Sequence, residues 1–154
     1  MKRRRKLWNI LLFFAYSALM LWLLFDRAGG IEGMDYWKQI QANLNLEPFH
    51  TIRLFLNVLG RKDYLSAAII NLGGTVILFI PLGFFLPAIW QSMRKWYKTL
   101  LTTAGMIAVV EILQALSLQG TCDIDDLILN TFGAWIGYLI YLRINKPQKK
   151  RKKR

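Results

Sequence analysis

The residues most able to do chemistry in this sequence share one stretch, in which polar side chains interrupt two apolar runs and crowd the turn between them. They are Glu111, Gln114, Asp123, Asp125, Asp126 and Asn130. A carboxylate at membrane depth costs about 2.5–3.5 kcal/mol on insertion scales, so an ionisable residue inside an apolar run is taken as functional by default. The stretch therefore predicts a polar site at a membrane.

Three interpretations of these side chains remain open. They could line a polar pocket that binds a headgroup, a cation or another ligand. The oxygens of Asp123, Asp125 and Asp126 could instead hold a divalent cation, and the cation a pyrophosphate, with Glu111 as general base. The third interpretation is structural: a protonated Glu111 fixes helix register by donating to a neighbouring amide, and Asp125 or Asp126 caps the following helix.

Four apolar runs long enough to span a bilayer surround these residues. They are residues 7–25, 65–93, 97–118 and 127–142. The first holds 19 uncharged residues and rises about 28 Å as a helix, close to the hydrocarbon thickness of about 30 Å. The last holds only 16, so it must extend into residues 124–126 or lie in a thinned bilayer. We predict an all-α membrane protein, a four-transmembrane-helix bundle with one domain.

The charges sit mainly at the two ends of the chain. The net charge is +12. Of the 21 Lys and Arg residues, five lie in residues 2–6 and eight in residues 143–154. The positive-inside rule places both basic tails (1–6 and 143–154) in the cytoplasm, next to anionic lipids, and the bundle (7–142) in the plasma membrane. Nucleic-acid binding is not expected, because no domain between the tails could carry specificity.

The segment from 26 to 64 is too charged to span. Within it, Ile52, Phe55, Leu56 and Leu59 recur at helical spacing, which predicts a short interfacial helix in the first extracellular segment. His50 is the only histidine and Cys122 the only cysteine, so neither a Cys/His metal site nor an internal disulfide can form. For His50 we expect an ordinary hydrogen bond. Acidic neighbours raise the pKa of a thiol, so Cys122 is not expected to be a nucleophile.

The helix faces suggest how the polar groups meet. Asn71 falls in the outer third of the second span, and Asp126, Asn130, Gly133 and Gly137 share one stripe of the fourth. Glycines four apart let a neighbouring backbone approach closely. Pro81 predicts a kink in the second span, which Gly83 makes easier. The predicted pocket opens to the outer face and is formed by Asn71, Glu111, Gln114, Asp123, Asp126 and Asn130.

Three blocks of the chain resemble the VanZ-like family of small bacterial membrane proteins. They are residues 45–52 (NLEPFHTI), Asn71 with 79–87 (FIPLGFFLP), and Glu111 with Gln114 followed by 123–133 (DIDDLILNTFG). The family usually carries a basic residue just before the acidic turn, where this chain has Thr121. The resemblance implies the plasma membrane of a Gram-positive bacterium and a link to susceptibility to the glycopeptide teicoplanin. It implies no settled reaction.

We therefore predict a non-enzymatic envelope protein that engages a lipid-linked cell-wall intermediate or the drug itself. The alternatives are a metal-dependent membrane hydrolase or transferase acting on a lipid pyrophosphate, and an assembly partner in which Gly133 and Gly137 mediate association. We assign no cofactor. The aspartates could hold a divalent cation. A homo-oligomer is compatible with each interpretation.

Overall fold

The computed structural model describes the backbone of residues 2–26, 33–58 and 62–145, and the side chains of these residues except 2, 58 and 62–71. The helices and strands, in chain order, are α1 (Lys2–Phe25), α2 (Tyr36–Ala42), β1 (Leu44–Asn45), α3 (His50–Val58), α4 (Lys62–Ile89), the 3₁₀ helix η1 (Gln91–Arg94), α5 (Trp96–Leu116), β2 (Cys122–Asp123) and α6 (Ile124–Ile144). The all-α prediction is confirmed.

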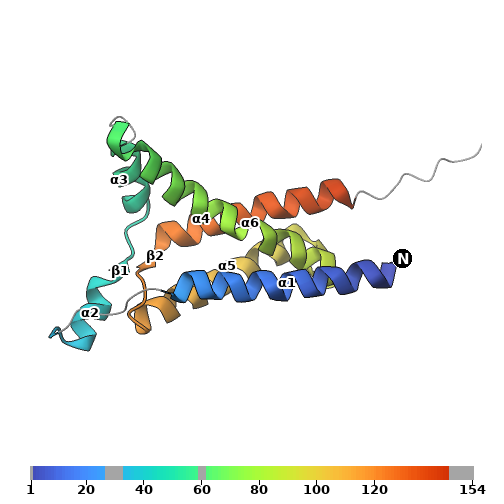
Figure 1. Ribbon diagram of the computed structural model, residues 1–154, viewed down its shortest axis with the longest axis horizontal. Coiled ribbons are helices and arrows are strands. Elements are labelled where there is room, and N and C mark those ends of the chain that lie inside the picture. Colours follow the sequence, from blue (N-terminus) through green and yellow to red (C-terminus); the bar gives the residue numbers. More distant parts are fainter. Residues whose placement is uncertain (1, 27–32, 59–61, 146–154) are drawn as a thin grey trace, which may run out of the picture.

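Four of these helices are long and apolar enough to cross a membrane. The candidate spans are Arg3–Phe25, Leu72–Ile89, Trp96–Leu116 and Ile124–Ile144. The short elements α2, β1, α3 and β2 gather at one end of the bundle, which we call the hairpin end (Figure 1). The start of α1, η1 and the end of α6 lie at the opposite end, called the termini end. The chain is thus a multi-pass membrane protein whose short polar elements cluster at one end.

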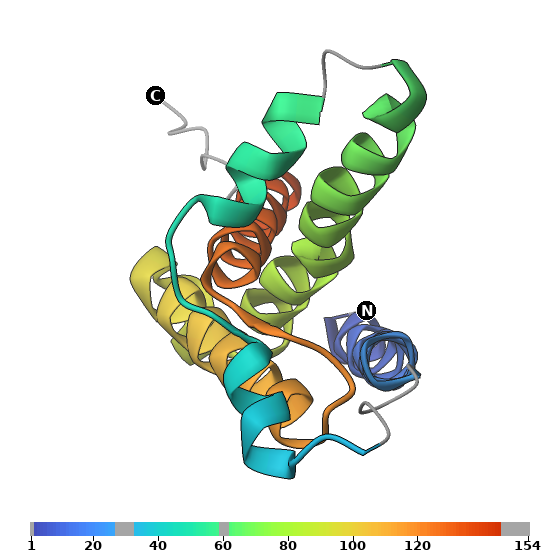
Figure 2. The ribbon, with the colours of Figure 1, turned by 90° about the vertical axis from the view of Figure 1, so that its left-hand side faces the viewer.

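The centre of the bundle is the contact between α4 and α6 (Figure 2). A Cβ added to Gly133 would overlap the carbonyl oxygen of Val76, and one added to Gly137 would overlap that of Ile80. In the other direction, a Cβ on Gly83 would overlap the carbonyl of α6 at Ala134. Lipid tails are as apolar as the side chains, so close backbone packing is a principal source of helix association in a bilayer.

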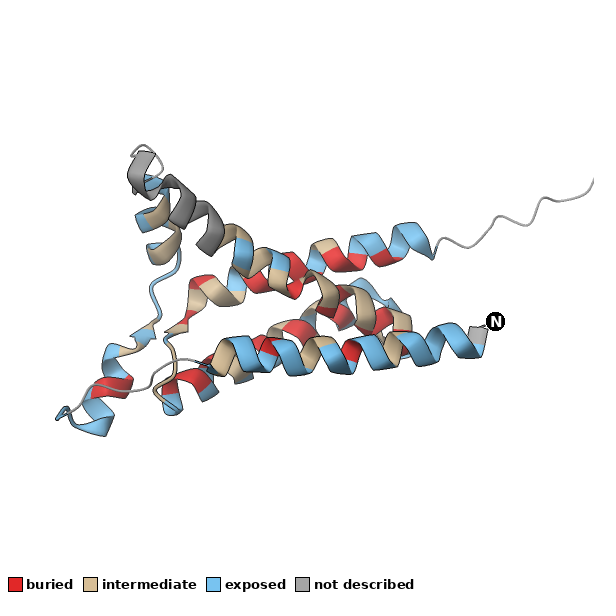
Figure 3. Cartoon of the chain, in the orientation of Figure 1, coloured by how far each residue is buried: buried red, intermediate tan, exposed pale blue. Residues whose placement is uncertain are grey.

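The other two spans pack around this pair. α5 lies mainly against α6, and α1 lies against α4, where the Tyr16 hydroxyl donates a 2.7 Å hydrogen bond to the carbonyl of Leu78. Most of α1 is exposed, apart from Phe13 and Met20, and many of the buried residues lie on α4, α5 and α6 (Figure 3). Phe79, Leu82 and Ile107 are the largest fully buried apolar side chains of this core. The exposed apolar surface of α1 suits lipid contact.

The structure confirms one prediction about the ends of the helices and corrects others. α6 begins at Ile124 and reaches Ile144, so the short fourth run extends into residues 124–126, as the first of the two expected alternatives required. The residue that caps α6 is Asp123, rather than Asp125 or Asp126, because the backbone turns from β2 into the helix directly after it. The helix α2 and the two-residue parallel pairing of β1 with β2 were not predicted. α4 continues as a helix through Pro81, and the kink predicted there stays a prediction.

The glycine contact gives a direct prediction for stability. Gly137→Leu places a side chain where the carbonyl of Ile80 lies, so α4 and α6 must separate, and overpacking of this kind costs about 1–3 kcal/mol or more. We expect a lower unfolding temperature in detergent and reduced membrane levels. Gly105→Leu is the matched control, because a Cβ at Gly105 meets no atom within 4 Å. Equal unfolding temperatures for the two variants would contradict this assignment.

Candidate functional site at the hairpin end

Asp123 connects four elements of the hairpin end. Its Oδ2 accepts hydrogen bonds from Asn45 Nδ2 of β1 (3.0 Å) and from Thr51 Oγ1 of α3 (2.6 Å). Its Oδ1 accepts the backbone N–H of Asp125 (2.8 Å) and so caps α6. Its own backbone N–H donates to Glu111 Oε2 of α5 (3.1 Å). The carboxylate is buried, and its two oxygens accept hydrogen bonds from three donors.

Asp125 joins α6 to the beginning of α3. Its Oδ1 accepts the backbone N–H of Phe49 (2.5 Å) and its Oδ2 accepts that of Ile52 (3.0 Å). A carboxylate at a helix N-terminus satisfies donors that the helix cannot and is favoured by the helix dipole. Phe49 has φ 65°, a left-handed conformation that costs a residue with a side chain about 1–2 kcal/mol. Hydrogen bonds to a buried charge, at about 1.5–3 kcal/mol each, outweigh that cost.

The two polar residues of α5 also make contacts within the chain. Glu111 is buried and accepts the N–H of Asp123. Gln114 is buried, and its Nε2 donates a 2.9 Å hydrogen bond to the carbonyl of Leu24 near the end of α1. Gly120 leaves room for the Gln114 side chain, since a Cβ there would come within 3.2 Å of its Cβ. Gln114 thus connects α5 to the end of α1.

Asn130 lies one turn beyond Asp126 along α6. It is 4% exposed, and its Oδ1 has no hydrogen-bond partner among the side chains and backbone that the structure describes. The side chain of Asn71, which we predicted to meet it, lies outside the described residues. The predicted role of Asn71 in a pocket stays a prediction.

A polar cavity of about 540 Å³ lies between α3, α4, α6 and β1 at the hairpin end. Its lining residues are Ala42, Leu44, Asn45, His50, Thr51, Leu54, Phe55, Leu72, Thr75, Thr121, Asp123 and Asp126. The polar groups in this set are carboxylates, hydroxyls, an amide and the imidazole of His50. No Lys or Arg is found among the described lining residues. The cavity therefore offers an acidic and hydrogen-bonding surface, suited to amine, hydroxyl or amide groups.

An apolar cavity of about 280 Å³ adjoins the polar one through Asp123, which lines both. Its other walls include Leu46, Ile112 and Leu127.

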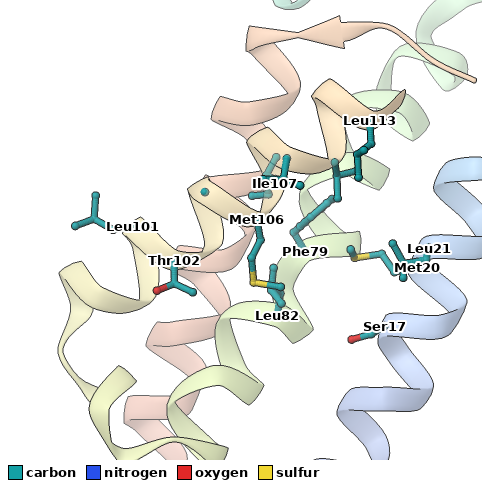
Figure 4. Close-up of a pocket in the computed structure, with 13 residues that line it drawn as sticks. Ser17, Met20, Leu21, Phe79, Leu82, Leu101, Thr102, Met106, Ile107 and Leu113 are labelled. Atoms are coloured by element: carbon teal, nitrogen blue, oxygen red, sulfur yellow. The ribbon is translucent and has the colours of Figure 1, made fainter. Parts of the chain in front are cut away.

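A second apolar space of about 560 Å³ separates α1 from α5 (Figure 4). Phe79 and Leu82 of α4 form its floor, with Met20 on α1 and Met106 on α5 at its sides (Figure 4). Ser17 and Thr102 are its hydroxyl-bearing residues, and no titratable side chain lines it among the described residues. Its composition is that of a lipid-facing groove.

The predicted site residues thus divide into two groups. Asp123 and Asp126 line the polar cavity, whereas Glu111, Gln114, Asp125 and Asn130 lie outside its walls. Sequence reasoning missed Asn45, Thr51 and Thr75 as lining residues. The signal was present in the polar stretch at 45–51, which was used only as part of the family resemblance.

The acidic turn does not form a ligand cluster for a metal ion. No group of three or more His, Cys, Asp or Glu residues that could hold a metal is found among the side chains of residues 3–26, 33–57 and 72–145. Both oxygens of Asp125 face backbone N–H groups, and Asp123 is surrounded by donors. The geometry in the turn is that of carboxylates engaged in capping and bridging.

Cys122 lies in β2, beside the buried carboxylates. Burial raises the pKa of its thiol, and the negative charges of Glu111 and Asp123 raise it further. Because the pKa is raised, the thiolate fraction at neutral pH is smaller than for an ordinary thiol.

We expect maleimide labelling of Cys122 in the folded protein to be slow at pH 7 and to accelerate only at alkaline pH. Labelling at pH 7 as fast as in the denatured protein would contradict this.

A second prediction concerns the bridge from α6 to α3. Asp125→Asn supplies one acceptor oxygen and an NH₂ group, so one of the two N–H donors, of Phe49 or Ile52, faces another donor. A buried unsatisfied donor costs about 1–3 kcal/mol. We expect a lower unfolding temperature and faster proteolysis within residues 33–58.

The matched control is Asp35→Asn. Asp35 also caps a helix, through the N–H groups of Trp37 and Lys38, but it is exposed, and Asn caps about as well as Asp. This variant should keep the wild-type unfolding temperature. If Asp125→Asn did so too, the bridge would not stabilise the fold.

Comparison with known proteins identifies a family for this chain. The family model described as VanZ/LLP1 matches residues 9–145. The matched region includes the short polar elements and all four spans, apart from the first residues of α1. No curated protein and no solved structure matches the chain significantly. The match covers most of the sequence, and the chain belongs to the VanZ/LLP1 family.

Proposed function

We propose that this VanZ-family membrane protein acts in the cell envelope by engaging a lipid-linked cell-wall intermediate or a glycopeptide such as teicoplanin, and thereby lowers susceptibility to the drug. The observation that carries the proposal is the polar cavity between α3, α4, α6 and β1. Both basic ends of the chain fit a cytoplasmic location of the termini in the plasma membrane. That orientation exposes the hairpin end to the outer surface, where such ligands lie.

The charge of the cavity indicates which part of such a ligand it would contact. Asp123 and Asp126 are in its wall, and Lys and Arg are absent from its described lining. A pyrophosphate would meet carboxylates there at close range, and like charges in a partly buried site repel strongly. Hydroxyls, amides and amines are the complementary groups. The proposed contact is therefore with the sugar or peptide part of the ligand, and the role is binding.

The neighbouring apolar cavity favours an amphiphile over a soluble sugar. It shares Asp123 with the polar cavity, and its accessible surface is apolar. Burial of an apolar chain contributes about 25 cal/mol per Å². A ligand with a carbohydrate or peptide head and an acyl or isoprenoid chain would use both cavities, as would the fatty-acyl chain of a lipoglycopeptide.

The test measures susceptibility and binding with the same variants. Wild type, Asp126→Asn and His50→Gln are expressed in a teicoplanin-sensitive Gram-positive host, with tagged protein quantified in the membrane. We expect the wild type to raise the inhibitory concentration and both variants to lose most of that effect at equal membrane levels. Asp35→Asn, exposed at the same end but outside the cavity, should behave as wild type.

Direct binding then identifies the ligand. Purified full-length protein is titrated with teicoplanin and, separately, with a lipid-linked muropeptide. Weakened binding of one of them by Asp126→Asn assigns the cavity to that ligand. Full retention of resistance in both cavity variants, together with unchanged binding of both probes, would refute the proposed function.

A further inference from the structure

A second polar cavity, of about 460 Å³, lies at the termini end, opposite the first. Its polar lining residues are Arg5, Lys6, Asn9, Gln91, Arg94 and Asn145, and Ala88 and Ile89 complete the wall. These residues come from the start of α1, the end of α4, η1 and the end of α6. Four segments distant in sequence therefore bring three cationic side chains and three amides to one concave surface.

The segments that carry the cationic residues of this cavity are held in place by contacts between the helices. The carbonyl of Arg94 accepts a 2.7 Å hydrogen bond from the hydroxyl of Tyr138, which ties η1 to α6. Asn145 closes α6, with its Nδ2 donating to the carbonyl of Tyr141 (3.1 Å). On the other side, Phe13 of α1 stacks edge-to-face on Trp90, just before η1. The backbone positions of the cationic residues are thus set by contacts that do not use their charged groups.

The segments that build this end contain no acidic residue. Asp and Glu are absent from residues 1–25, 64–110 and 127–154, which include every segment of the cavity wall. The cationic groups therefore have no carboxylate within these segments to pair with. Three nearby cations repel one another, and an anion between them relieves this repulsion.

We propose that this basic cavity binds a phosphate group, supplied by an anionic phospholipid headgroup or by free phosphate. Arg supplies paired N–H donors that match phosphate oxygens, and Lys adds a compact positive charge. The amides of Asn9, Gln91 and Asn145 add donors for the remaining oxygens. The cavity lies where the apolar spans end, which is the depth of lipid headgroups.

The test uses full-length protein in a mild detergent and three probes: phosphatidylglycerol, phosphatidylcholine and inorganic phosphate. Lipid binding is measured by native mass spectrometry and phosphate binding by calorimetry. The variant Arg5→Gln/Lys6→Gln/Arg94→Gln removes the cations of the cavity. We expect wild type to prefer phosphatidylglycerol, or to bind inorganic phosphate. Each removed cation should weaken that binding about fivefold, so the triple variant should weaken it on the order of 100-fold.

The matched control removes three positive charges from the same end outside the cavity, as Lys95→Gln/Lys98→Gln/Arg143→Gln. It should bind as wild type, which separates a built site from general charge attraction. Preference for phosphatidylglycerol that millimolar phosphate does not displace assigns the site to the lipid headgroup. Phosphate binding without a preference between the lipids assigns it to free phosphate. Equal loss in both variants, or a wild type that binds neither anionic probe, would overturn the proposal.

Discussion

The hairpin end depends on one buried carboxylate, that of Asp123. It receives hydrogen bonds from β1 and α3, caps α6, and its backbone N–H reaches Glu111 of α5. A buried charge is tolerated only when donors surround it, and here those donors come from segments up to 78 residues away in the chain. The requirement to solvate this carboxylate within the protein thus fixes where the short elements lie. The wall of the polar cavity follows from that arrangement, because Asn45, Thr51 and Asp123 belong to it.

The rest of the bundle rests on a different constraint, the close contact of α4 with α6. Glycines on both helices meet the backbone of the other helix directly, so packing is tight at the centre, while α1 and α5 lie further from each other around a groove. Gly133 and Gly137 are therefore occupied within the chain. An assembly role based on this stripe would require α4 to leave it. The glycines account for the packing of the bundle, and the hairpin end accounts for the polar surface that the bundle presents.

The spans and their number could be predicted from the sequence, because an apolar run of sufficient length has few alternatives in a chain of this composition. The clustering of polar residues at one end was also predictable from depth along each span. The partners of those residues were not. Helical periodicity places Glu111 on a face but cannot show that its partner is a backbone N–H, and nothing local indicates that Asp125 reaches across to Phe49. The role of Asn45 depends on β1 pairing with β2, a contact across 78 residues.

The two ends of the molecule offer surfaces of opposite preference. At the hairpin end, carboxylates and neutral donors line the cavity, and at the termini end cations and amides do. A phosphate favoured at one end is repelled at the other, so the two cavities would not compete for the same group of a ligand. In the proposed orientation, with the basic end in the cytoplasm as the positive-inside rule predicts, the acidic cavity would lie at the outer surface. The same charge distribution would then serve two purposes: it sets the orientation in the bilayer, and it reserves the outer cavity for the sugar or peptide part of an envelope ligand.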